Sequence, residues 1–344
     1  MYEFQWQPLT FQLRNPFRVA HGTSQTRHGW WLRLSGDCGW GEGTIPPYYG
    51  ISNEEMIAFW QMMAKRRSPF PETVAEIAEW VGGNGPAPAR CALDLALHDR
   101  LARMQGVSLY ELLGLPKPPP QPTAVTIGID SPAAMAQMAR QMTSYPVLKL
   151  KLGSENDEIR VAAVRAVRPD VRLWVDANAA WSPEEAVSRL KPLLGYGLEL
   201  VEQPVPPTDV RGMGFVQSQL DVPVVADESV QTLADVEKLA AVGVQGINVK
   251  LMKVGGVAPA LAIIHRAREL GLRVMLGCMV ESSLGVTAMA HLAGLADWLD
   301  LDAPLLLVND PFVGVTYSDT AVLQLPQRPG IGVVLRESLG VTDA

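Results

Sequence analysis

The feature that most constrains the fold is the even spacing of short apolar runs from residue 123 onward, with a helical segment in each gap. From the second run to the eighth, the ends of consecutive runs lie 22 to 28 residues apart. A strand, a helix and their two connections need roughly that length, and eight such units close a parallel barrel. Residues 305–344 lack a long helical period, so we expect no complete helix after the eighth strand. The predicted fold class is α/β, a (β/α)7β modified TIM barrel.

Residues 1–120 differ in character, and we expect them to form an N-terminal α+β domain that caps the barrel. Residues 1–35 predict two strands, the first broken by the Pro-Phe pair at 16–17. The segments WWLRLSG and GWGEG predict a strand pair joined by a Gly-rich turn. Apolar periodicity predicts helices over residues 53–67, 72–82 and 88–105.

A proline-rich segment, LPKPPPQP at residues 115–122, marks the boundary between cap and barrel. Such a segment cannot continue a helix or a central strand. We therefore assign residues 121–310 to the barrel and residues 311–344 to a C-terminal segment that returns to the cap.

Composition excludes several classes of protein. Hydrophobic residues make up 48% of the 344 residues and charged residues 19%, so a large core is expected. The net charge of −7 argues against nucleic acid or an anionic membrane as partner. No apolar run reaches the length of a membrane span, and no signal-peptide core is seen. The three cysteines form no CxxC pair, which fits a reducing cytoplasm.

Acidic residues stand where three successive runs end, and function resides at that end of the strands in such a barrel. They are Asp176, Glu202 and Asp227. Three carboxylates at one barrel mouth repel one another unless a cation neutralises them. All-oxygen ligands favour Mg²⁺, with Mn²⁺ as an alternative. For any single acid, capping of the following helix is the competing interpretation.

Lysines end the second and sixth runs. Lys149 and Lys151 are two residues apart on one strand, so both point the same way, and Lys250 lies across the barrel from them. Crowding beside a divalent cation lowers the pKa of a lysine and makes it usable as a base. Two opposed lysines suit removal of a proton alpha to a carboxylate and its return on the other face. An ion pair is the alternative for Lys250, and we expect Lys253 to face solvent or a neighbouring acid.

The motifs KLKLG, DAN, EQP, ADES, NVKLMKVGG and DLDAP resemble the enolase superfamily, muconate-lactonizing subgroup, and within it the dipeptide epimerases, which include the L-Ala-D/L-Glu epimerases. The resemblance implies that Lys151 and Lys250 are the acid and base, and that Lys149 supports the substrate carboxylate or its enediolate. It implies that Asp176, Glu202 and Asp227 are the metal ligands, with Asn178 and Glu228 beside them as supporting residues.

The resemblance also assigns substrate contacts to the last two strands. An Asp-x-Asp motif on the eighth strand binds the substrate ammonium group in the dipeptide epimerases, and it matches Asp300 and Asp302. A strand end with a turn is the competing interpretation of these two acids. The segment GCMVESS matches the pocket-lining part of the seventh strand, with candidates Cys278, Met279 and Glu281. Cys278 could equally be a small core residue.

Residues 21–27, expected as a loop, and 44–52 are implied to cover the site and to select the substrate side chain. The L-Ala-D/L-Glu epimerases carry an arginine in the first segment. This chain has Gly22 near that place, with Arg18 and Arg27 offset. The candidate contacts in the two segments are Gly22, Tyr48, Tyr49 and Ile51, for which ordinary packing is the alternative.

These features together predict a Mg²⁺-dependent dipeptide epimerase. It would invert the alpha carbon of the C-terminal residue of an L-Xaa-L-Xaa dipeptide by two-lysine 1,1-proton transfer through a metal-stabilised enediolate. The alternatives on the same scaffold are N-acylamino-acid racemase, o-succinylbenzoate synthase and cycloisomerase activities. A more distant alternative is a metal-dependent binding protein without catalysis. The expected partner is a small-molecule dipeptide, with a homo-oligomer as a further possibility.

Overall fold

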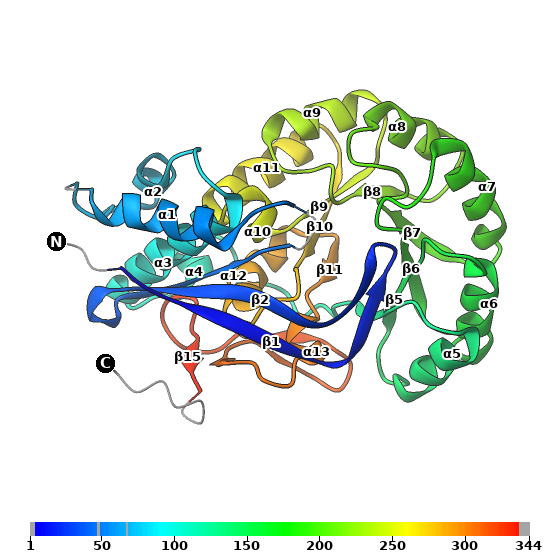
Figure 1. The fold of residues 1–344 in the computed structure, drawn as a ribbon, viewed down its shortest axis with the longest axis horizontal. Helices are drawn as coiled ribbons and strands as arrows, with labels where there is room; N and C mark the ends of the chain where they lie inside the picture. Colours follow the sequence, from blue (N-terminus) through cyan, green and yellow to red (C-terminus); the bar gives the residue numbers. More distant parts are fainter. Residues whose placement is uncertain (1–3, 47–48, 67, 337–344) are drawn as a thin grey trace.

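The computed structural model describes residues 4–46, 49–66 and 68–336, arranged as a cap beside a parallel barrel (Figure 1). The cap contains strands β1 (Phe4–Val19), β2 (Gly22–Leu34) and β3 (Gly39–Thr44) and helices α1 (Asn53–Ala64), α2 (Val74–Val81), α3 (Ala87–Gln105) and α4 (Leu109–Leu112). Within the described ranges, none of the helices combines the length and the apolar character that crossing a bilayer requires.

The barrel strands are β4 (Val125–Ile127), β5 (Val147–Lys151), β6 (Arg172–Asp176), β7 (Leu198–Glu202), β8 (Val224–Ala226), β9 (Gly246–Val249), β10 (Arg273–Gly277) and β11 (Trp298–Asp300). Its helices are α5 (Pro132–Gln141), α6 (Asp157–Val167), α7 (Pro183–Leu194), α8 (Val210–Ser218), α9 (Leu233–Ala241), α10 (Leu251–Val254), α11 (Val257–Glu269), α12 (Ser283–Ala290) and α13 (Ala303–Leu306). Four two-residue strands follow, namely β12 (Phe312–Val313), β13 (Thr316–Tyr317), β14 (Leu323–Gln324) and β15 (Val334–Leu335).

The eight barrel strands confirm the predicted fold class. Each overlaps a predicted apolar run, and the ladder runs from β4 to β11 in chain order with parallel neighbours. The two outermost strands approach each other, since the Ala124 amide donates to the Leu299 carbonyl at 2.8 Å. The eighth strand is followed only by the four-residue α13, in place of a complete helix.

The barrel interior is filled by a layer of apolar side chains. Trp174, Leu200 and Val225 belong to this layer and are almost completely buried. Each lies two residues before one of the three acidic residues predicted to meet at the barrel mouth. Because side chains alternate along a strand, this layer packs directly beneath those carboxylates and holds the three strand ends in place.

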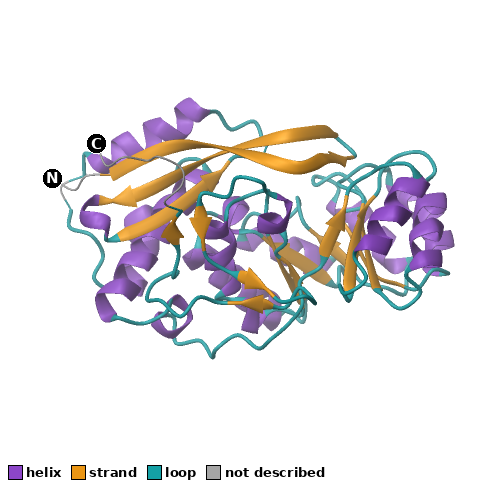
Figure 2. Ribbon diagram, turned by 90° about the horizontal axis from the view of Figure 1, so that it is seen from below, coloured by secondary structure: helices purple, strands orange, loops and turns teal. Residues whose placement is uncertain are grey.

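The long β1–β2 hairpin of the cap extends toward the carboxyl ends of the barrel strands (Figures 1 and 2). The prediction that residues 16–17 break the first strand is wrong, because β1 passes through them. The pairing of β1 with β2 shifts register between Gln12 and Phe17. Pro16 therefore lies in a bulge, where no backbone N–H is needed to pair with β2. Residues 21–27 likewise form the turn and the start of β2 rather than a loop.

Strand β3 packs directly on the backbone of α3, which explains the spacing of its glycines. A side-chain carbon added at Gly41 would lie 1.7 Å from the Ala92 carbonyl oxygen, and one at Gly39 would lie 2.1 Å from the Ala96 oxygen. Alternate residues of a strand share a face, so the three glycines of GWGEG give the helix a face without side chains.

A buried carboxylate fastens this strand to the barrel. Glu42 is fully buried and accepts hydrogen bonds from the amides of Ser282 (2.9 Å) and Gly285 (3.1 Å) and from the Ser282 hydroxyl. Burial raises the pKa of Glu42, and these donors oppose that effect. The end of β3 is therefore held rigidly against the loop that follows β10.

The chain beyond the barrel contacts the cap. The Leu109 amide donates to the Gly330 carbonyl, and the Gly330 amide donates to the Val107 carbonyl, each at 2.9 Å. The Ile331 amide donates to the Asp99 carboxylate on α3 at 2.7 Å. The described part of the C-terminal segment thus closes the side of the molecule where the cap and barrel meet.

Candidate active site

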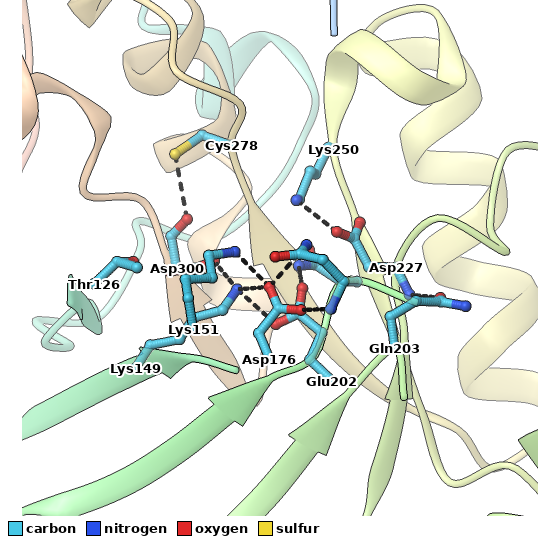
Figure 3. Close-up of polar contacts among 12 residues, drawn as sticks. Thr126, Lys149, Lys151, Asp176, Glu202, Gln203, Asp227, Lys250, Cys278 and Asp300 are labelled. Atoms are coloured by element: carbon cyan, nitrogen blue, oxygen red, sulfur yellow. Dashed lines mark hydrogen bonds and ion pairs between the residues drawn. The ribbon is translucent and has the colours of Figure 1, made fainter. Parts of the chain in front are cut away.

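Three carboxylates converge at the barrel mouth. Asp176 and Glu202 are the last residues of β6 and β7 and are paired in the ladder, and Asp227 directly follows β8. Their side chains are at most 1% exposed. Figure 3 shows them at the ends of adjacent strands, with lysines on either side. The strand spacing thus brings together the three acids that it predicted would meet.

Lysines flank this row from opposite sides of the barrel. From β5, the Nζ of Lys151 lies 2.5 Å from Oδ2 of Asp176. Just after β9, the Nζ of Lys250 lies 2.7 Å from Oδ2 of Asp227 (Figure 3). Since β5 and β9 are four strands apart in an eight-stranded barrel, the two ammonium groups face the mouth from opposite directions. Both lysines line the cavity found there.

Lys149 occupies a different environment from Lys151. Its Nζ lies 2.6 Å from Oε2 of Glu202, 2.7 Å from Oδ2 of Asp300 and 3.2 Å from Oδ2 of Asp176. Burial alone lowers the pKa of this lysine, but the three carboxylates outweigh it and raise the pKa well above its ordinary value. The lowered pKa expected for Lys149 assumed a neighbouring divalent cation, whereas the side chains by themselves raise it. The groups around Lys149 are mainly carboxylates, so its ammonium group is a cation shared by Asp176, Glu202 and Asp300.

Lys253 is buried in the site. The sequence predicted that its side chain would face either solvent or a neighbouring acid. Its Nζ lies 2.6 Å from Oδ1 of Asp227 and also donates to the carbonyls of Asp227 and Asn248. The neighbouring acid is therefore the correct alternative. Helix α10 begins immediately after Lys250, so the lysine three positions later returns to the same face of the chain. That spacing was the signal available in the sequence.

The carboxylates at the barrel mouth have the chemistry of ligands for a divalent cation, although among the described residues no three acidic, histidine or cysteine side chains are already grouped as a metal site. Oε2 of Glu228 is buried without a hydrogen-bond donor, and Oε2 of Glu202 is buried next to the Lys149 ammonium group. Burial raises the pKa of Glu202 to about 7 and that of Glu228 to about 8, with neighbouring carboxylates adding to both shifts. Oxygen atoms of this kind, buried and crowded, are the donors that Mg²⁺ or Mn²⁺ takes in proteins.

Other polar side chains orient the carboxylates. Asn178, with φ of 45°, donates its backbone amide to Asp176 at 2.9 Å and its side-chain amide to Glu228 at 3.2 Å. Asn248 donates to Oε1 of Glu202 at 2.9 Å. Sequence reasoning placed Asn178 and Glu228 beside the ligands but missed Asn248. Asn248 lies two residues before Lys250, so strand alternation directs it into the barrel.

The Asp-x-Asp pair lies at the edge of the same cavity. Asp300 ends β11, but Asp302 has helical dihedral angles (φ −100°, ψ −1°), so the expectation that both belong to one strand is wrong. Both carboxylates nevertheless line the cavity, and Oδ2 of Asp302 accepts the Thr126 amide at 2.7 Å. Burial and the neighbouring Asp300 raise the pKa of Asp302 to about 6.

The cavity itself is small, about 80 Å³, and the cap supplies part of its wall. The predicted residues Cys278 and Met279 line it. Lining residues that the sequence did not single out come from the hairpin and from the ends of other strands: Phe17, Val19, Thr44, Ile45, Pro46, Thr126, Val280 and Leu306. The pairing of β1 with β2, which brings Phe17 to the barrel, is not visible in the sequence.

Several predicted lid contacts lie elsewhere. Gly22 is in the exposed turn of the β1–β2 hairpin, and Ile51 packs against the hydrophobic core of the cap. Neither these residues nor Tyr49 are among the described residues that line the cavity, and Tyr48 lies outside the described residues. Glu281 is buried and does not line the cavity, and burial, with the charge of Glu42 adding to it, raises the pKa of Glu281 well above the ordinary value. Arg27, predicted as offset, does line the cavity.

Comparison with known proteins gives two family matches. The description "Enolase C-terminal domain-like" matches residues 132–339, and "Mandelate racemase / muconate lactonizing enzyme, N-terminal domain" matches residues 5–114. An L-Ala-D/L-amino acid epimerase from Maribacter sp. is 38% identical over 95% of this chain and 98% of its own length. The L-Ala-D/L-Glu epimerase of Bacillus subtilis is 34% identical over 95% of this chain and 94% of its own length.

A similar solved structure is the dipeptide epimerase from Enterococcus faecalis complexed with Mg and the dipeptide L-Leu-L-Tyr. It superposes with a TM-score of 0.90 at 31% identity, covering 96% of this chain and 98% of its own. The chain belongs to the enolase superfamily, in the family of mandelate racemase and muconate lactonizing enzyme.

Proposed function

We propose that this protein is a dipeptide epimerase that inverts the alpha carbon of the C-terminal residue of an L,L-dipeptide. The observation that carries the proposal is the placement of Lys151 and Lys250 on opposite sides of one cavity, with the row of carboxylates between them. Relatives that match nearly the whole chain are named as epimerases of dipeptides, which supports the same reaction class.

In this proposal the two lysines exchange roles between the stereoisomers. One lysine, in its neutral form, removes the alpha proton from its own side of the carbon. The other, as an ammonium group, returns a proton from the opposite side, which inverts the configuration. The carbanion formed between these steps is an enediolate of the substrate carboxylate. Mg²⁺ held by Asp176, Glu202 and Asp227 would supply positive charge that stabilises it, with Mn²⁺ as a substitute.

The remaining residues of the cavity would bind the two ends of the dipeptide. Asp300 and Asp302 are buried carboxylates that suit the N-terminal ammonium group of the substrate. Arg27 lines the cavity from the cap and is suited to a carboxylate on the second side chain, as in a dipeptide that ends in L-Glu. Lys149 contacts three carboxylates, and its positive charge would reduce the repulsion among them at the barrel mouth.

The test is deuterium uptake by mass spectrometry. The protein is incubated in D₂O with Mg²⁺ and pooled L,L-dipeptides, and we expect a gain of one dalton in at least one of them. Lys151→Ala and Lys250→Ala should each abolish epimerisation, and each should retain exchange from only one stereoisomer. Full epimerisation by either variant would refute the two-base scheme. Exchange confined to N-acylated amino acids would favour a racemase of such substrates instead.

A further inference from the structure

A second cavity adjoins the candidate active site. It has a volume of about 380 Å³, and it shares three lining residues, Phe17, Thr126 and Leu306, with the cavity at the lysines. We refer to it as the outer cavity. The cavity at the lysines, at about 80 Å³, is too small to enclose a dipeptide together with a large side chain, since sites for small molecules usually enclose several hundred Å³. The outer cavity offers the missing space next to it.

The outer cavity arises from two irregularities in the fold. The four-residue α13 takes the place of a complete eighth helix and leaves room beside α5. Residues 13–16 of β1 form the bulge that does not pair with β2. This bulge is held against the C-terminal side of the barrel, where Leu13 bridges to Leu307 and the Gln12 amide donates to Asn309 at 2.7 Å. These contacts hold one wall of the cavity against the barrel.

The wall of the outer cavity is mostly apolar. Leu13, Ile129, Met138, Met142, Tyr145 and Leu305 supply most of it. The two charged residues of the wall, Arg14 and Asp130, are exposed and form local hydrogen bonds. Arg14 Nε donates to the Leu305 carbonyl, and Asp130 accepts the Ser131 amide. Two methionines in such a wall can adjust to ligands of different shapes.

The position of the Asp-x-Asp pair links this cavity to the substrate. If Asp300 and Asp302 hold the substrate ammonium group, the carbon that bears that group lies beside Thr126, whose amide Asp302 accepts. Thr126 belongs to the shared wall, with the half-buried side chains of Phe17 and Leu306. The side chain on that carbon therefore starts at the entrance to the outer cavity.

We infer that the outer cavity receives the side chain of the N-terminal residue of the dipeptide and that this residue is a large apolar one such as leucine or methionine. The inference rests on the proposed function. Phe17 and Leu306 line both cavities, and Met138 lines the outer cavity alone. Large apolar side chains gain the free energy of burial there, whereas alanine leaves the cavity unfilled.

The test compares dipeptides that differ only in the first residue. Rates of alpha-proton exchange are measured for L-Leu-L-Ala, L-Met-L-Ala and L-Ala-L-Ala, and again with L-Glu as second residue. We expect kcat/KM to be at least about tenfold higher for leucine and methionine than for alanine in both series. Equal values, or a preference for alanine, would overturn the inference while leaving the proposed function intact. Exchange with no dipeptide would refute both.

A pair of variants places the effect in this cavity. Met138→Trp fills the outer cavity and should lower the leucine-to-alanine ratio of kcat/KM by about fivefold or more. Met104→Trp, at a methionine that is 64% exposed on α3, is the matched control and should keep the wild-type ratio. An unchanged ratio in Met138→Trp would overturn the inference. If that variant does not fold, Met138→Phe gives the same comparison with a smaller change in volume.

Discussion

Asp302 offers a sharp test of how the site binds a substrate amine. Its carboxyl group is buried, its pKa is raised to about 6, and Oδ2 already accepts the Thr126 amide. The substitution Asp302→Asn preserves that hydrogen bond and the volume of the side chain, but it removes the negative charge. Loss of one member of a buried charge pair costs about 2 kcal/mol at the lower limit, or about 30-fold in kcat/KM at pH 7.

The pH dependence of this loss follows from the raised pKa. The carboxyl group is about 90% ionised at pH 7 and about 10% ionised at pH 5, so protonation makes the wild-type protein resemble Asp302→Asn as the pH falls. The substrate ammonium group stays charged over this range, because an α-amino group has a pKa near ~8. The ratio of kcat/KM between wild type and Asp302→Asn should therefore fall about sevenfold, from about 30 to about 4.

The assay is alpha-proton exchange at saturating Mg²⁺ with one free-amine dipeptide, from pH 5 to 7. The ratio of kcat/KM between the two proteins is compared at each pH. Other titrating groups are present in both proteins, so their effects cancel in the ratio. Asp319→Asn, at an exposed aspartate far along the C-terminal segment, is the matched control and should track the wild type. A ratio that stays constant with pH would refute the assignment of the ammonium group to Asp302.

Three further predictions concern stability and the metal. Lys149→Met removes the cation shared by three buried carboxylates and should lower the free energy of unfolding by about 3–5 kcal/mol in metal-free buffer. Lys238→Met, at an exposed pair, should cost less than about 1 kcal/mol, and comparable losses in the two variants would contradict the role of Lys149. Chelation by EDTA should abolish proton exchange and added Mg²⁺ should restore it, and activity that survives dialysis against EDTA would exclude a required metal. Gly41→Ala should destabilise the protein by about 3 kcal/mol or more because the new carbon meets the Ala92 carbonyl, whereas Gly83→Ala has open space and should not, as urea unfolding will measure.

Much of the site follows from two periodicities of the sequence. The repeat of the strand–helix unit fixes where each strand ends, and alternation within a strand fixes which residues face the barrel axis. Asp176, Glu202 and Asp227 satisfy both conditions, and so do Lys149 and Lys151 on β5. Residues on regular strands could therefore be placed without coordinates, although the resemblance was needed to assign their roles.

Residues beyond the strand ends could not be placed in the same way. The conformation of Asp302 depends on the turn into α13, and the contact of Lys253 with Asp227 depends on where α10 begins. The cap posed a further difficulty, because the position of Phe17 and Arg27 is set by a hairpin with an internal shift of register. One residue of slip in such a pairing moves every side chain to the other face, and local sequence does not specify it.

The bond between Glu42 and Ser282 has a consequence for how such proteins can be rebuilt. It joins positions 240 residues apart, one in each of the two matched family regions. A chimaera that combines the cap of one relative with the barrel of another would keep the backbone donors to this carboxylate only if the loop after β10 followed the same path, and it would lose the hydroxyl donor if the new barrel had no serine at that position. Recombination at the proline-rich linker is therefore constrained by a contact distant from it. Exchange of the hairpin tip leaves the Glu42 contact in place, so the tip is a better segment to vary when selectivity is redesigned, provided that the Arg18 carbonyl still accepts the Ile129 amide of the barrel.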